Sequence, residues 1–517
     1  VTKSLLLFAL PMILGNMLQQ LYNVADTFIV GQFIGSNALA AVGSSFTLMT
    51  FLNSIILGLC MGSGVLFSML YGAKKMDKMK NAFFISFVGI GLLSVALEAV
   101  CLLLIDPILS FLQIPLEIWS DTHGYLFYIF LGILFTFLYN YFASLLRALG
   151  DSRTPLLFLG VSAIGNIILD IYFIVSLHMG VAGAAIATTM SQALSAIGLF
   201  VYVFYQQRDL LPQKEYWYFD KSVFQKIKDY SLLTCVQQSV MNFGILLIQG
   251  LVNSFGLVTM SAFAAAVKID SFAYMPVQDF GNAYSTFVAQ NKGAGLEERI
   301  RKGTKSAVIV AALFCFLIST IVFNFADTLM LIFIKPEQTE IILKGAEYLR
   351  IEGACYLGIG LLFLLYGYYR GVGKPGISVV LTIVSLGTRV LLSYALAPTL
   401  GEHMIWWSIP IGWFLADAIG VVQGIRKEKW FSRKRAEDEK VFQRLVKSAS
   451  FWGLSTDTIR FYEKNGLVHP HVNPEKVITA MYTLMNVLEL LDVIYYRHLD
   501  FPLSDIYELS KALKPSY

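Results

Sequence analysis

The chain contains little charge, cysteine or histidine. Only 14% of its 517 residues are charged, and its six histidines show no metal-ligand spacing. The five cysteines stand singly within apolar stretches, which indicates neither a disulfide framework nor a Cys-x-x-Cys metal site. The formal net charge of +4 does not by itself indicate a nucleic-acid partner. We therefore expect no cofactor and no enzymatic activity.

Apolar surface is what the chain has in abundance. Hydrophobic residues make up 56% of it, and up to about residue 425 they gather in stretches of roughly 20 residues, which is long enough to cross a membrane as helices. The first stretch shows no signal-peptide pattern, so it is predicted to remain as a helix. Twelve spans are predicted, near residues 5–30, 46–70, 82–105, 122–147, 155–177, 181–205, 230–253, 260–290, 303–326, 345–369, 375–397 and 403–425.

Basic residues are concentrated in alternate connections between these spans. By the positive-inside rule those connections face the cytoplasm, and an even number of spans then places both termini there. We expect a monomeric, multi-pass protein of the cell's inner (plasma) membrane. The basic connections carry Lys74, Lys75, Lys78, Lys80, Arg147, Arg153, Arg208, Lys214, Lys221, Lys226, Lys228, Lys292, Arg299, Arg301, Lys302, Lys305, Arg370 and Lys374.

The chain also repeats itself at an interval of about 221–223 residues. The tripeptide at 72–74 (GAK) returns as GAG at 293–295, and RALGD at 147–151 returns as RGVGK at 370–374. A duplicated apolar unit of this size is typical of secondary transporters, whose halves surround a shared site. The predicted fold is an all-α membrane protein with twelve transmembrane helices in two parallel six-helix repeats. The predicted lobes are residues 1–205 and 230–425, joined by a cytoplasmic linker at 206–229.

Two acids within the predicted spans need an explanation, because a charge at mid-membrane costs on the order of 2.5–3.5 kcal/mol. Asp26 lies in the first span and Asp170 in the fifth. Tyr22 and Asn166 each precede one of these acids by four residues, on the same helix face. With Thr188 of the sixth span they form an oxygen-rich set that suits Na+ or a proton. The alternative is that these side chains only hydrogen-bond to neighbouring helices.

The second half does not repeat this set. At the repeat interval Leu247 stands for Asp26, Arg389 for Asn166 and Ser393 for Asp170, so ion coupling is predicted to lie within residues 1–205. Other charges of the second half are predicted to be internal ion pairs or anchors. They are Lys268 with Asp270, and Arg350 with Glu347 and Glu352, while Asp279 is a candidate cavity-facing acid and Glu98 and Asp417 are weaker candidates.

Pro11 lies inside the first predicted span, fifteen residues before Asp26. Proline removes a backbone donor and permits a bend. It is either a joint that moves the Asp26 carboxylate or a passive kink.

Three segments resemble the multidrug and toxic compound extrusion (MATE) family over roughly residues 1–425. They are YNVAD at 22–26, LRALGD at 146–151 with Pro155, and VAQNKGA at 288–294. The resemblance implies export of organic cations and drugs by alternating access, in exchange for protons or sodium.

The resemblance also implies roles for single residues. Asp26, Asn166, Asp170 and Thr188 match the cation site of the N-terminal lobe in the family's DinF-like branch, and Tyr22 and Pro11 match its moving first helix. The 39 Phe and 26 Tyr residues would suit a cavity for flat organic cations.

The last ninety residues differ in composition. Residues 426–439 form a basic juxtamembrane linker, and 440–517 form a short soluble segment. The stretch 455–467 resembles the second helix of the winged helix-turn-helix in MerR-type regulators, so a small MerR-like helical domain is predicted. Its net charge of about +1 is a weak basis for binding DNA, and a docking or ligand-sensing module that regulates the transporter is the alternative.

Two further classes of function remain open. A flippase for lipid-linked precursors would favour more spans and several cavity arginines to hold pyrophosphate, and the buried acids argue against it. A membrane-tethered regulator would act through a DNA-binding tail.

Deleting residues 437–517 distinguishes a transporter from a tethered regulator. We expect drug efflux from cells to continue after the deletion, because the predicted spans and the oxygen-rich set all lie before residue 426. Loss of efflux at an unchanged membrane level of the protein would contradict this expectation.

Overall fold

The computed structural model describes residues 1–111 and 114–424, with isolated positions at 493 and 502. The chain divides into two compact units after Val421, and the first unit contains the elements that follow, except for the last three residues of the final helix. The predicted juxtamembrane linker 426–439 lies outside the described residues, as does the predicted MerR-like domain 440–517 apart from those two positions.

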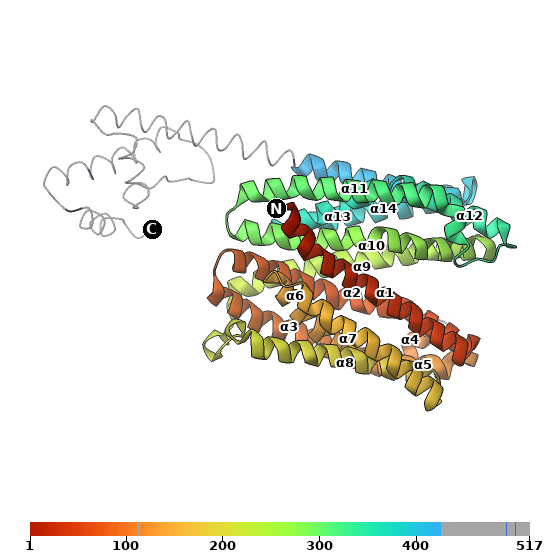
Figure 1. Ribbon diagram of the computed structural model, residues 1–517, viewed down its shortest axis with the longest axis horizontal. Helices are drawn as coiled ribbons and strands as arrows, with labels where there is room; N and C mark the ends of the chain where they lie inside the picture. The colour runs from red at the N-terminus through yellow and green to blue at the C-terminus, as the bar shows by residue number, and fades with distance from the viewer. Residues whose placement is uncertain (112–113, 425–492, 494–501, 503–517) are drawn as a thin grey trace. The chain divides into compact units, whose positions relative to one another are not determined.

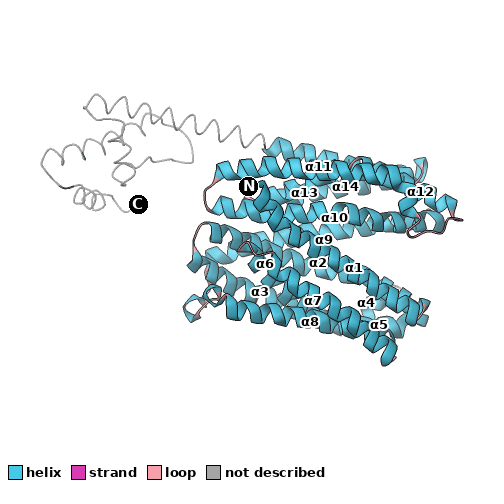
Figure 2. Cartoon of the chain, in the orientation of Figure 1, coloured by secondary structure: helices cyan, strands magenta, loops and turns pink. Residues whose placement is uncertain are grey.

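The described part of the first unit is built from helices and connections, without a strand (Figure 2). The first half contains α1 (Thr2–Phe33), α2 (Ser36–Gly72), α3 (Met76–Leu103), α4 (Ile105–Phe111), α5 (Leu116–Phe130), α6 (Ile133–Ala148), α7 (Arg153–Asp170), the π-helix η1 (Ile171–Ser176) and α8 (Gly180–Gln206). Two short 3₁₀ helices follow, η2 (Arg208–Leu210) and η3 (Lys214–Tyr216). The second half contains α9 (Lys221–Asn253), α10 (Leu257–Gly293), α11 (Glu297–Met330), α12 (Thr339–Ala354), α13 (Tyr356–Gly371), α14 (Pro375–Leu400) and a last helix His403–Gly424.

Within the described residues nine helices are long and apolar enough to cross a membrane, and counting each of two bent pairs as one span raises the number to eleven. The predicted eighth span corresponds to α10, which has 37 residues and carries Lys268, Asp270 and Asp279. With α10 the order of helices matches the twelve predicted spans. The prediction of an all-α membrane protein is confirmed.

Two of the predicted spans are broken, which the sequence did not indicate. The stretch predicted at 122–147 consists of α5 and α6, bent by 41°, and the stretch at 345–369 consists of α12 and α13, bent by 54°. The breaks fall at Gly132 and Cys355, which are equivalent positions of the two repeats. Apolar periodicity continues across each break, so hydropathy alone shows one span.

Glu98 of α3 supports the first of these breaks. Its Oε2 accepts a hydrogen bond of 3.0 Å from the backbone N–H of Leu134, in the first turn of α6. The first N–H groups of a helix have no partner within that helix, and lipid supplies none. The candidate acid Glu98 therefore has a structural partner in this fold.

The sharp turns between helices are repeated as well. Gly35 after α1 and Gly256 after α9 have φ of 121° and 93°, and Gly150 after α6 and Gly373 after α13 have φ of 95° and 83°. Such positive φ values are easily adopted only by glycine. Turn geometry thus preserves the duplication where the neighbouring side chains have diverged.

The fold has two apolar cores, and α1 belongs to both. One core extends from Ile29 to Ile227, and the other from Ile248 to Ala416 together with Leu5, Ala9 and Met12 at the start of α1. Figure 1 shows α1 running obliquely from beside α10 and α11 towards α4. The helix continues without interruption through Pro11. Movement of one core relative to the other must therefore act on α1.

The connection between α8 and α9 covers residues 207–220, which is shorter than the predicted linker 206–229 because α9 already begins at Lys221, and it is tied to α3 and to the start of α9. The buried amide of Asn81 donates hydrogen bonds to the backbone oxygens of Tyr216 (3.0 Å) and Tyr218 (2.8 Å). Asp220 caps α9 by accepting the N–H groups of Ser222 (2.8 Å) and Val223 (3.3 Å). The side-chain hydroxyl of Ser222, followed by these two N–H groups, holds the pKa of Asp220 below its usual value.

The helices α2 and α10 touch backbone to backbone at two equivalent glycines. A Cβ atom at Gly72 would lie 1.9 Å from the carbonyl oxygen of Gln290, and one at Gly293 would lie 1.9 Å from that of Met69. Neither contact leaves room for a side chain. The two halves are consequently in closest contact at the end where α2 and α10 terminate.

Replacing Gly72 or Gly293 by alanine should separate α2 from α10. Overpacking of this kind costs about 1–3 kcal/mol, so we expect the melting temperature of the purified protein to fall. Gly89→Ala in α3 is the matched control, because a Cβ there meets no atom within 4 Å and alanine favours a helix. An equal melting temperature for Gly72→Ala and Gly89→Ala would contradict the close contact.

Candidate functional site

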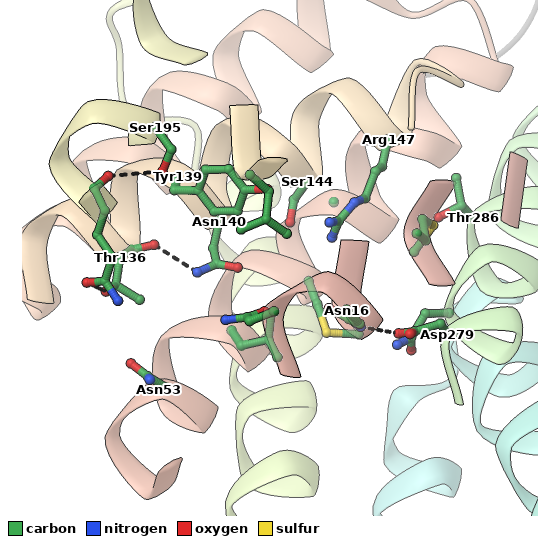
Figure 3. A pocket seen from close by; sticks show the side chains of 18 of the residues that line it. Asn16, Asn53, Thr136, Tyr139, Asn140, Ser144, Arg147, Ser195, Asp279 and Thr286 are labelled. Carbon is green, nitrogen blue, oxygen red and sulfur yellow. Dashed lines mark hydrogen bonds between the residues drawn. The ribbon is translucent and has the colours of Figure 1, made fainter. Parts of the chain in front are cut away.

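A polar cavity of about 210 Å³ lies between the two halves and is lined by side chains of both. Helix α1 contributes Asn16, Gln19 and Tyr22 to its wall, α10 contributes Asp279 and Asn282, and α6 and α13 contribute one arginine each. Figure 3 shows Arg147, Asn16 and Asp279 around this space, with Tyr139 and Asn140 of α6 on another side.

The acid in this wall is Asp279, which is 3% exposed. Its Oδ1 accepts a hydrogen bond from the side-chain amide of Asn16 in α1, so this contact joins the two halves (Figure 3). Arg147 acts electrostatically on Asp279, but among the described residues the two form no ion pair. Asp279 is thus a cavity residue held by an amide.

The acids predicted for ion coupling lie close together next to the cavity. Asp26 is 8% exposed and Asp170 is fully buried, and the two carboxyl groups interact with each other. Asn166 of α7 donates a hydrogen bond of 3.4 Å to the Thr188 hydroxyl of α8. The structure therefore brings all four predicted residues into one cluster drawn from α1, α7 and α8.

Four buried oxygen atoms of this cluster have no hydrogen-bond partner within the described residues. They are Oδ1 of Asp26, Oδ1 of Asn166 and both carboxylate oxygens of Asp170. Buried polar atoms are normally satisfied, because leaving one unpaired costs about 1–3 kcal/mol. Carboxylate and amide oxygens of this kind suit a hard cation, and two adjacent carboxyl groups can equally share a proton.

Tyr22 connects this cluster to the cavity. It lines the cavity one helical turn before Asp26, and its hydroxyl lies in the electrostatic field of Asp26 and Asp170. Tyr125 of α5 lies in the same field. Sequence reasoning missed Tyr125, because its stretch has an ordinary apolar pattern and its contact with the acids is tertiary.

The backbone changes at Asp170 itself. This residue ends α7, and the six-residue π-helix η1 begins directly after it. π-helical segments are rare and occur frequently at functional sites, because they reposition side chains relative to an α-helix. Composition carried no signal for this change.

The second half contains a different group of buried charges. Asp270 of α10 and Glu352 of α12 are 5% and 1% exposed, and both interact with Arg389 of α14. The hydroxyls of Tyr348 and Tyr356 adjoin them. Arg389 occupies the repeat position of Asn166, so a permanent cation stands where the first half has an amide.

The ion pairs predicted for the second half are wrong. Lys268 is exposed, and its Nζ lies 5.8 Å from the centre of the Phe333 ring instead of pairing with Asp270. Arg350 pairs with Asp327 of α11, not with a neighbouring glutamate. Lys268 and Asp270 are two residues apart and so point to different faces of α10, whereas Arg350 reaches across to the neighbouring helix α11. Asp417, on the last helix, is buried with both oxygens unpartnered in the described structure.

A duplicated helical bundle with a polar cavity between its halves, and buried acids beside that cavity, defines a membrane transporter. The chain belongs to the multidrug and toxic compound extrusion (MatE) family, whose model matches residues 11–172 and 234–395. The resemblance to this family found in the sequence is confirmed, while its DinF-like branch stays a prediction. Residues 449–513 match the model of the MerR HTH family regulatory protein, which likewise confirms the resemblance of the tail.

Relatives of this chain bear names that describe different activities. The "Probable multidrug resistance protein YpnP" of Bacillus subtilis is 31% identical over 390 residues, covering 74% of this chain and 86% of that protein. A FAD transporter of Shewanella oneidensis is 26% identical over 425 residues, covering 78% and 88%. In fold, the chain resembles a MOP superfamily transporter of Pyrococcus furiosus with a TM-score of 0.78 and 22% identity, over 82% of this chain and 95% of that one.

The charge group of the second half is expected to matter for stability. Arg389→Met leaves Asp270 and Glu352 buried without their cation, and breaking a buried charge group costs about 3–5 kcal/mol. We expect a lower melting temperature for this variant, and Arg389→Lys should lose less because it keeps the charge. Adding Asp270→Asn and Glu352→Gln to Arg389→Met should restore stability, and a further decrease would contradict the assignment.

Proposed function

We propose that this protein is a secondary active antiporter that exports small drug-like molecules in exchange for protons or sodium ions. The observation that supports it is the position of the acid cluster, which consists of Asp26, Asn166, Asp170 and Thr188. Four buried oxygens of Asp26, Asn166 and Asp170 have no hydrogen-bond partner within the described residues. Tyr22 forms part of the cavity wall and interacts electrostatically with both acids, so it connects them to the cavity.

The acid cluster requires an exchangeable positive charge. No lysine or arginine forms an ion pair with Asp26 or Asp170 in the described part of the chain. Two adjacent buried carboxylates repel each other, so a proton or a cation must neutralise at least one of them. A group that requires neutralisation and adjoins a cargo cavity can couple ion entry to cargo release.

Helix α1 provides a route for this coupling. It carries Asn16 and Tyr22 in the cavity wall and Asp26 in the acid cluster, and it packs in both apolar cores. Ion binding at Asp26 would alter how α1 packs against α7, and that change would reach the Asn16–Asp279 contact. Pro11, which lies where α1 packs in the second core, is the candidate joint.

The energy available is sufficient for export. One elementary charge crossing 100 mV supplies about 2.3 kcal/mol, equivalent to a roughly fiftyfold gradient of cargo. Any ion gradient adds to this. With both termini in the cytoplasm, as the loop charges predict, the Gly72–Gly293 contact would seal the cytoplasmic side in the present conformation. The lobes 1–205 and 230–425 would then alternate around the cavity.

Substitution of the two acids tests the proposal. We expect Asp26→Asn and Asp170→Asn each to reduce efflux of norfloxacin and ethidium from cells at least tenfold, because an amide cannot exchange a proton or balance a cation. Efflux should be measured with and without sodium, which distinguishes the two ions. Asp121→Asn, an exposed acid of α5 in the same half, is the matched control and should export as the wild type does.

Unchanged efflux in both variants would refute the proposed coupling site. Ethidium and norfloxacin also differ in charge, since norfloxacin carries a carboxylate and ethidium does not. The ratio of the two efflux rates therefore reports on cargo charge separately from ion coupling.

A further inference from the structure

Two arginines at equivalent positions of the repeat line the central cavity. Arg147 is in the last turn of α6 and Arg370 is in the last turn of α13, and both are part of the cavity wall. The sequence placed them in cytoplasmic connections, where they would serve only to orient the protein. In the structure they are helical residues, and Arg370 is only 4% exposed.

Neither arginine has a carboxylate partner. The Nε of Arg370 donates to the carbonyl oxygen of Tyr366 at 3.3 Å, and its Nη2 donates to Oδ1 of Asn282 at 2.7 Å. The Nε of Arg147 is buried and makes no hydrogen bond within the described structure. Figure 3 shows the Arg147 side chain extending into the cavity. The ion pairs of the described residues involve other side chains.

The charges in the cavity wall do not balance. The residues that line the cavity include one carboxylate, Asp279, and two guanidinium groups. The Asp279 carboxylate already accepts a hydrogen bond from Asn16. Most of the other polar lining residues are amides and hydroxyls, which are uncharged. The cavity wall therefore has an excess of positive charge.

Helix ends offer a simpler explanation for these arginines, because a cation near a helix C-terminus is favourable. That effect accounts for the bond from Arg370 to Tyr366, a carbonyl in the last turns of α13. It does not account for the direction of Arg147, whose buried Nε has no carbonyl partner. Arg153, at the same end of the molecule, is exposed and shows that an arginine there can reach solvent.

We propose that Arg147 and Arg370 together bind an anionic group, a carboxylate or a phosphate, on the exported molecule. A guanidinium group offers paired N–H donors that match both oxyanions. Tyr22, Phe135 and Tyr139 line the same cavity and provide surfaces for a flat ring. The preferred cargo is therefore a flat amphipathic molecule with one anionic end, not a pure organic cation. This inference rests on the proposed transport function and specifies its substrate class.

Flavin mononucleotide and riboflavin form a matched pair of probes, because they share one ring system and differ by a single phosphate. Binding is measured on the purified full-length protein by flavin fluorescence, without an ion gradient. We expect the wild type to bind flavin mononucleotide at least tenfold more tightly than riboflavin. Arg147→Met and Arg370→Met should each lower that ratio by about tenfold, which is the effect of losing one charged hydrogen bond.

Control variants separate this effect from loss of folding. Arg147→Lys keeps the charge and should retain part of the preference, and Arg153→Met removes an exposed arginine outside the cavity and should leave the ratio unchanged. A misfolded variant would lose both ligands, whereas the proposal concerns their ratio. Where a methionine variant binds neither flavin, the lysine variant decides the question.

Equal affinity of the wild type for the two flavins would overturn the inference. It would also be overturned if Arg147→Met and Arg147→Lys each lost affinity for both flavins by the same factor, because the preference for the phosphate would then not depend on the guanidinium group. A carboxylate as the anionic group is tested by adding norfloxacin as competitor, with ethidium, a cation that has no carboxylate, as its counterpart. Failure of ion coupling in the Asp26 and Asp170 variants would leave this binding preference intact, so the two proposals fail separately.

Discussion

Lipid offers no hydrogen-bond partner, and the architecture of this protein follows from that constraint. Where a helix breaks inside the membrane, as between α5 and α6, a side chain from elsewhere in the fold must accept the freed N–H group, and Glu98 does so. Where α2 meets α10, glycines permit each helix backbone to pack directly against a backbone carbonyl group of the other. Buried polar atoms left unsatisfied in such a setting are conspicuous, and among the described residues those of Asp26, Asp170 and Arg147 lie at or next to the cavity.

Those unsatisfied atoms carry both signs of charge, at different places. Asp26 and Asp170 form a negative cluster in the first half, and Arg147 and Arg370 face the cavity between the halves. The separation is consistent with a division of labour in which an inward-moving cation and an outward-moving cargo occupy different sites. Tyr22 of α1 lines the cavity and interacts with Asp26 and Asp170, so the two ligands can compete through this helix without touching each other.

The repeat has been modified unequally in its two copies. Turns and helix breaks recur at matching positions, since Gly35 corresponds to Gly256 and Gly132 to Cys355. Buried charge does not recur in the same form, because Arg389 in the second half acts electrostatically on Asp270 of α10 and Glu352 of α12. The second half thus has a cation beside its buried acids, whereas Asp26 and Asp170 form no ion pair with a lysine or arginine among the described residues.

The sequence by itself determined the class of fold, the duplication and four members of the acid cluster. Hydropathy reports length and apolarity directly, and an acid inside an apolar span stands out because its insertion is costly. Only the tertiary structure decided which charges meet. Lys268 and Asp270 are two residues apart and face different surroundings, whereas Arg147 and Arg370 are far apart in the chain and line one cavity. Packing between helices sets such distances, and a linear pattern cannot contain them.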